Sequence, residues 1–79
     1  MNFYTDSNIE VYKEACKIGW GDRYDMNMGN FRFTEDEITI DNLLKILSWL
    51  ENHNNYAFIY ESCEDYGDYC WWLTPKSTL

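Results

Sequence analysis

Two runs of strand-forming residues near the end of the chain constrain its fold more than any other feature. Residues 56–62 and 68–74 are both rich in aromatic and β-branched side chains, and a short acidic segment with one glycine separates them. This pattern predicts a β-hairpin. Pro75 follows the second run and is expected to close its strand, because proline has no N–H to donate to a ladder.

The hairpin carries more aromatic side chains than one face of a sheet needs. Trp71 and Trp72 are neighbours in a strand, so their side chains must point to opposite faces. Tyr56, Phe58 and Tyr60 alternate with smaller residues and are expected to share one face. The second face is then either an exposed aromatic surface or covered by residues 19–30 and the chain ends.

Two segments predict amphipathic helices. The capping residues at positions 5–8 and the apolar spacing that begins at Ile9 predict a helix over residues 7–18, with Cys16 as a small core residue. A second helix is predicted over residues 39–53. Two capping patterns, one beginning at Thr34 and one at Thr39, place its start between residues 37 and 41. Its apolar stripe, widened by Ile46 and Trp49, is expected to form the centre of the core and comprises Ile40, Leu43, Leu44, Leu47 and Leu50.

Together these elements predict an α+β fold. Alternating aromatic and polar residues over 30–34 predict a third strand, and the glycine-rich residues 19–30 predict an irregular loop. The expected architecture is a small three-stranded sheet, formed by residues 30–34 and the hairpin 56–62/68–74, with both helices on one face. The chain has 79 residues, which predicts a single domain over 1–79.

The composition indicates a soluble protein whose cysteines are free thiols. Aromatic residues make up 19% of the chain, enough to build a core without disulfides. Cys16, Cys63 and Cys70 are odd in number and lack paired spacing, which favours free thiols, with a Cys63–Cys70 bridge as the alternative. No apolar run approaches the roughly 20 residues that span a bilayer, and the first residues lack a secretion signal. We therefore expect a cytoplasmic protein, either monomeric or dimeric.

Charge is the most unusual bulk property. Fourteen Asp and Glu residues against six Lys and Arg give a net charge of −8. Residues 1–30 hold five acids and three bases (−2), whereas residues 31–79 hold nine acids and three bases (−6). Such a chain is steered toward basic surfaces, and direct binding to nucleic acid or an anionic membrane is disfavoured.

The sequence lacks a constellation for catalysis. The single histidine, His53, lies in a polar segment where a helix is expected to end, and none of the three cysteines has a neighbouring base. The cysteines and the histidine lack the paired spacing of zinc ligands, and the acidic turn after residue 63 lacks the ligand pattern of a calcium loop. We expect a protein that is not an enzyme and holds no metal or cofactor.

The acidic residues instead suggest a partner-binding face. One cluster surrounds the start of the second helix, the other surrounds the hairpin turn, and exposed aromatic side chains interleave with them. Aromatic residues anchor interfaces, while surrounding carboxylates supply electrostatic complementarity. Helix-end placement and ordinary turn chemistry are the simpler explanations of the two clusters. The candidate partner-binding residues are Glu35, Asp36, Glu37, Asp41, Glu61, Glu64, Asp65, Tyr66, Asp68, Tyr69 and Trp72.

Three segments of the chain resemble the small immunity proteins of tRNA-cleaving colicins: residues 9–19 (IEVYKEACKIG), residues 30–33 (NFRF) and residues 54–59 (NNYAFI). Residues 61–74 have no counterpart in that family. The resemblance implies a cytoplasmic inhibitor that occupies the basic RNA-binding cleft of a toxin. Small phage anti-defence proteins, including anti-CRISPR proteins, look similar in size and charge. No residue role is carried over from either group.

Two functions follow as hypotheses. The first is an acidic inhibitor that mimics nucleic acid and binds the basic nucleic-acid-binding surface of a nuclease, toxin or defence complex. The alternative is an adaptor or subunit that binds a partner protein through an exposed aromatic sheet face, with the charge serving solubility alone.

Overall fold

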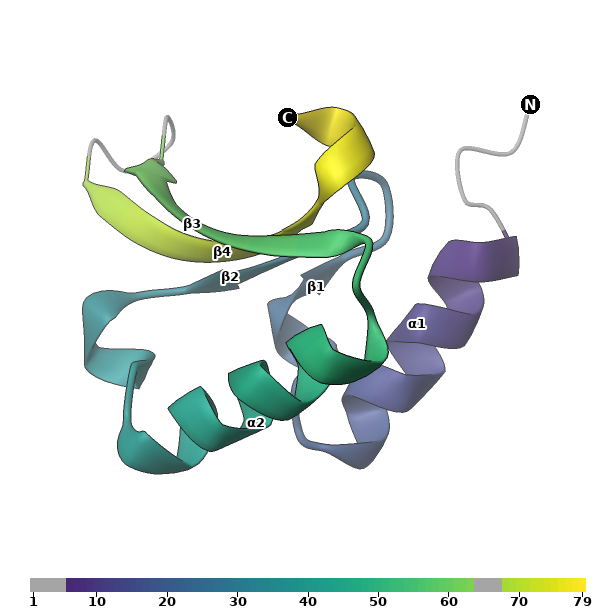
Figure 1. Ribbon diagram of the computed structural model, residues 1–79, viewed down its shortest axis with the longest axis horizontal. Coiled ribbons are helices and arrows are strands. Elements are labelled where there is room, and N and C mark those ends of the chain that lie inside the picture. Colours follow the sequence, from purple (N-terminus) through teal and green to yellow (C-terminus); the bar gives the residue numbers. More distant parts are fainter. Residues whose placement is uncertain (1–5, 64–67) are drawn as a thin grey trace.

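The computed structural model describes residues 6–63 and 68–79, which form an α+β fold with two α-helices and a four-stranded antiparallel sheet (Figure 1). The sheet order is β1-β2-β4-β3, and both helices lie on the same side of the sheet. The elements in chain order are α1 (Asp6–Lys17), a 3-10 turn η1 (Gly21–Arg23), β1 (Tyr24–Asp25), β2 (Asn30–Phe33), a 3-10 turn η2 (Glu35–Glu37), α2 (Ile40–Asn52), β3 (Tyr56–Ser62), β4 (Tyr69–Pro75) and a 3-10 turn η3 (Lys76–Thr78).

The predicted hairpin is confirmed as β3 and β4, and Pro75 is the last residue of β4. The two tryptophans do point to opposite faces. Trp71 pairs with Phe33 across the β2–β4 ladder and packs against the buried core, whereas Trp72 pairs with Arg32 and lines a depression on the outer face.

The prediction of three strands was wrong, because residues 24–25 form a fourth strand, β1, within the expected loop. Asp25 makes the turn between β1 and β2, since its carboxylate accepts hydrogen bonds from the backbone N–H groups of Asn27 (2.9 Å) and Met28 (3.2 Å). Gly29 completes the turn with φ +73°, a conformation that glycine adopts without strain. Local side-chain chemistry therefore turns a glycine-rich segment into a small hairpin.

Helix α1 ends in a way that delivers a tryptophan to the core. The N–H of Trp20 donates to the carbonyl of Ala15 (2.8 Å) and that of Gly19 to the carbonyl of Cys16 (3.3 Å), the paired bonds of a Schellman motif around Gly19 at φ +82°. Trp20 is then almost fully buried, edge-on to Phe31 with ring centroids 5.5 Å apart. The buried core comprises Ala15, Trp20, Tyr24, Phe31, Phe33, Ile46, Trp49, Tyr56 and Leu73.

The predicted core face of α2 was right for Ile46 and Trp49 but wrong for most of the aliphatic stripe. Only Ile46 and Trp49 are buried on this helix, and four members of the stripe, Ile40, Leu43, Leu44 and Leu47, are exposed. The fifth, Leu50, is partly buried.

Asn42 explains the orientation of α2. Its side-chain amide accepts a hydrogen bond from the Trp20 indole (3.4 Å) and donates one to the carbonyl of Glu37 (2.6 Å). These two bonds hold the Asn42 side chain toward the core. Asn42, Ile46 and Trp49 recur at helical spacing and so share one face. Because that face of α2 packs against the core, the aliphatic stripe on the other side of the helix faces solvent.

The cysteines also differ from expectation. Cys16 is exposed, and its neighbour Ala15 takes the buried position on α1 instead. Cys63 and Cys70 are buried free thiols, so the alternative of a bridge is not present. None of the helices in the described part of the chain is long and apolar enough to cross a membrane.

Candidate functional site

Sheet topology brings four members of the two acidic clusters to one end of the molecule. Because β2 and β3 are each antiparallel to β4, the end of β2, the end of β3 and the start of β4 lie at the same edge of the sheet. The η2 turn follows β2 directly and carries Glu35 and Asp36, while Glu61 lies near the end of β3 and Asp68 precedes β4. All four carboxylates belong to exposed residues. Figure 1 shows this end of the sheet at the left.

Two exposed tyrosines lie at the same end of the sheet, on the face that carries the helices, whereas alternation along β3 directs Glu61 to the opposite face. Tyr60 is 43% exposed and Tyr69 is 56% exposed, and their ring centroids are 5.1 Å apart. The Tyr60 hydroxyl donates a hydrogen bond to Glu35, which fixes η2 against β3. This bond to a carboxylate raises the pKa of Tyr60, so the hydroxyl remains a donor at neutral pH. We call Glu35, Asp36, Tyr60, Glu61, Asp68 and Tyr69 the acidic–tyrosine end.

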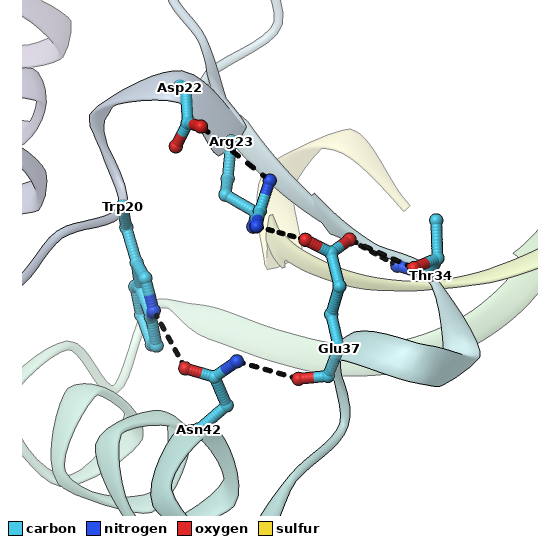
Figure 2. Close-up of polar contacts among 6 residues, drawn as sticks. All are labelled: Trp20, Asp22, Arg23, Thr34, Glu37 and Asn42. Atoms are coloured by element: carbon cyan, nitrogen blue, oxygen red, sulfur yellow. Dashed lines mark hydrogen bonds and ion pairs between the residues drawn. The ribbon is translucent and has the colours of Figure 1, made fainter.

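Glu37 is one of the predicted site residues, but it has a structural role. Its carboxylate accepts hydrogen bonds from the backbone N–H of Thr34 (2.9 Å) and from the Thr34 hydroxyl (3.0 Å), and it forms an ion pair with Arg23 (Figure 2). Thr34 and Glu37 thus form the predicted capping box, although it caps η2 and not α2. Helix α2 has its own N-cap, Thr39.

The remaining predicted site residues are dispersed or not described. Asp41 is exposed in the first turn of α2. Trp72 is half-buried on the opposite sheet face from Tyr69 and donates through its indole to the carbonyl of Glu61 (3.4 Å). It therefore does not join Tyr69 in one aromatic anchor. Glu64, Asp65 and Tyr66 lie outside the described residues.

The outer face of the sheet carries a second surface. A broad, open depression of about 1180 Å³ covers it, with Arg32, Ile59 and Trp72 on its floor and the turn at Thr78 at its rim. Its lining combines the Trp72 ring and the guanidinium groups of Arg23 and Arg32 with the carboxylates of Asp22, Asp25 and Glu61. The depression corresponds to the second sheet face, which is bordered but not covered by the chain end.

His53 lies at the end of α2, as its position in the sequence predicted. Its Nδ1 lies 3.0 Å from the carbonyl oxygen of Trp49, its Nε2 lies 3.0 Å from the Glu14 carboxylate, and its ring stacks on the Trp49 indole with centroids 3.8 Å apart. These contacts join α1 to α2, which gives His53 a structural role in holding the two helices together.

The thiol of Cys70 lacks the features of an activated nucleophile. Burial raises the pKa of Cys70, and the neighbouring thiol of Cys63 raises it further, which disfavours the thiolate. Within residues 6–63 and 68–79, no group of three or more His, Cys, Asp or Glu side chains is arranged to hold a metal ion.

Sequence reasoning missed two surface features. Tyr60 was expected to share a sheet face with Tyr56 and Phe58, which it does, but it was not among the predicted site residues, and its ring is exposed. The exposed aliphatic stripe of α2 was also missed, because spacing shows that apolar residues share a face but not which face meets the core. Comparison of the chain with protein-family models, with curated proteins and with solved structures found no match.

Proposed function

We propose that the protein is an acidic inhibitor that uses the acidic–tyrosine end to occupy the basic nucleic-acid-binding surface of another protein, such as a nuclease or a defence complex. The observation that carries this proposal is that four exposed carboxylates, those of Glu35, Asp36, Glu61 and Asp68, lie at the same end of the sheet as the paired rings of Tyr60 and Tyr69. Carboxylates take the place of phosphates, and the tyrosines provide the flat apolar contacts that anchor an interface.

The net charge of the whole chain also supports binding of the acidic–tyrosine end to a basic surface. A net charge of −8 accelerates association with basic surfaces and repels nucleic acid itself. The hydrogen bond from Tyr60 to Glu35 holds part of the surface in place before binding, which lowers the entropy lost on association.

Charge reversal at the proposed surface tests the function. The variant Glu61→Lys/Asp68→Lys alters the acidic–tyrosine end, and the control Glu10→Lys/Asp22→Lys alters exposed acids on α1 and η1. Each reversal adds two charges, so both variants have a net charge of −8 + 4 = −4. We expect the wild type and the control to recover nucleic-acid-binding proteins from a bacterial lysate at low salt, and the site variant to recover at least about tenfold less.

Competition identifies the surface that is occupied. Added duplex DNA or RNA should displace the captured proteins, because it binds the same basic cleft, and high salt should release them. Recovery of neutral or acidic proteins that is insensitive to salt, or equal recovery by both variants, would contradict the proposal.

The alternative function is an adaptor that binds through aromatic side chains alone. The exposure of Tyr60 and Tyr69 on the sheet face favours it. Under this alternative, charge reversal of Asp68 leaves binding unchanged, whereas Tyr69→Ser, which keeps the charge constant, abolishes it. The inhibitor proposal expects both changes to weaken binding.

A further inference from the structure

Helix α2 carries a second candidate interaction surface. Ile40 is 77% exposed, Leu44 61% and Leu47 57%, and Leu43 beside them is 37% exposed. These four residues, here called the leucine stripe, recur at the i, i+3, i+4 and i+7 spacing of one helix face. An ordinary surface helix buries its single apolar face, but α2 buries Ile46 and Trp49 and leaves the stripe in solvent. A contiguous run of exposed aliphatic side chains of this kind marks an interaction site.

The stripe is bordered by negative charge. Asp41 lies beside its amino end, and Glu51, four residues after Leu47, continues the same helix face at the other end; both are exposed. Lys45 is the one basic residue of α2, and its ammonium group donates to the carbonyl of Ile18 (3.1 Å), toward the end of α1. The stripe therefore combines an apolar centre with carboxylates at both ends.

We propose that the leucine stripe is a docking surface for a cationic amphipathic helix of another protein. A straight stripe of about two turns complements the apolar face of a second helix, whose anchors recur at the same spacing. Lysine or arginine residues at the borders of that helix would meet Asp41 and Glu51. This surface uses residues outside the acidic–tyrosine end, so the proposal does not depend on the proposed function.

Charge also argues against a second copy of this chain as the occupant. A two-fold dimer through α2 would bring the same stripe, with its own Asp41 and Glu51, against itself. It would also join two chains that each carry a net charge of −8. Like charges placed together across an interface disfavour the complex, whereas a basic helix gains from the same carboxylates.

A designed peptide tests the proposal. The probe is a synthetic peptide of about four helical turns, with leucine at the spacing of one helix face and lysine elsewhere; the control peptide has the same composition in scrambled order. Isothermal titration calorimetry should show the patterned peptide binding at least about tenfold more tightly than the scrambled peptide. The comparison separates recognition of the stripe from general attraction of lysine to an acidic protein.

Substitutions in the protein test whether the patterned peptide binds at the leucine stripe. Leu44→Ser/Leu47→Ser should remove the advantage of the patterned peptide, whereas Met28→Ser, at an exposed apolar residue outside α2, should keep it. Tryptophan fluorescence checks that each variant is folded, since Trp20 and Trp49 lie in the core. Asp41→Asn/Glu51→Gln should weaken binding by about fivefold at low salt and less at high salt.

Three outcomes would overturn the proposal. Equal binding of the two peptides, or no binding of the patterned peptide, would show that the stripe does not select an amphipathic helix. Unchanged binding by the serine variant would place the contact elsewhere. Self-association in sedimentation velocity that the serine variant abolishes would make a second copy the occupant.

Discussion

At the scale of single residues, the carboxylates of this acidic chain divide into those that hold the fold and those that face solvent. Glu37 belongs to the first group, because it accepts two hydrogen bonds from Thr34 and pairs with Arg23. Its neighbour Asp36 belongs to the second and is exposed. The capping box was visible in the sequence, since Thr34 and Glu37 have the required spacing. The pairing with Arg23 was not, because it depends on the path of the chain between the two residues.

Removing these two neighbouring carboxylates should have different effects on stability. We expect Glu37→Ala to lower the free energy of unfolding by about 1–3 kcal/mol, since it removes charge-assisted hydrogen bonds and one of the two carboxylates that pair with Arg23. Asp36→Ala should change it by less than about 0.5 kcal/mol, as is usual for an exposed position. Urea denaturation followed by tryptophan fluorescence measures both. Equal losses for the two variants would show that the capping box contributes nothing particular.

At the scale of elements, the sequence predicted the helices and the three longer strands to within about two residues. These elements have strong local signals: alternation in β2, β-formers in β3 and β4, and capping residues before each helix. Strand β1 was missed because its pairing depends on one Asp side chain and one glycine conformation. The orientation of α2 was missed because Asn42, a polar residue, decides which face turns inward.

The turn that creates β1 can be tested with two glycines. Gly29 has φ +73°, and an added Cβ there would lie 3.3 Å from the side-chain oxygen of Asn8. The side-chain N–H of Asn8 donates a hydrogen bond to the carbonyl of Met26 (2.8 Å), which holds this side chain in place. Gly19 has φ +82°, but an added Cβ would have no atom within 4 Å. The left-handed conformation should cost about 1–2 kcal/mol in either alanine variant.

Gly29→Ala should therefore destabilise the protein more than Gly19→Ala, because it adds a steric contact to the same conformational cost. Thermal denaturation of both variants beside the wild type makes the comparison. If Gly19→Ala proves equally or more destabilising, the turn around Gly29 must accommodate a methyl group by a small shift of Asn8.

At the scale of the whole molecule, three surfaces with different chemistry surround one aromatic core. The acidic–tyrosine end lies at one edge of the sheet, the leucine stripe lies on α2, and the depression around Arg32 and Trp72 lies on the outer sheet face. The sequence predicted that negative charge gathers in the second half of the chain. It could not separate the carboxylates that bind within the fold from those that remain available to a partner, because that division depends on contacts between distant segments.

The net charge of −8 should make the fold more stable at moderate salt than at low salt. Repulsion among exposed carboxylates destabilises the compact state, and raising the ionic strength shortens the screening length from about 30 Å at 0.01 M to about 8 Å at 0.15 M. The exposed Lys13–Glu10 pair opposes this trend only weakly, since such pairs contribute about 0–1 kcal/mol. We expect the urea midpoint to rise between 0.01 M and 0.15 M sodium chloride. The rise should be smaller in Asp36→Asn/Asp68→Asn, which removes two exposed charges from the acidic–tyrosine end. A midpoint that falls with salt would mean that attractive pairs, led by Arg23 and Glu37, outweigh the repulsion.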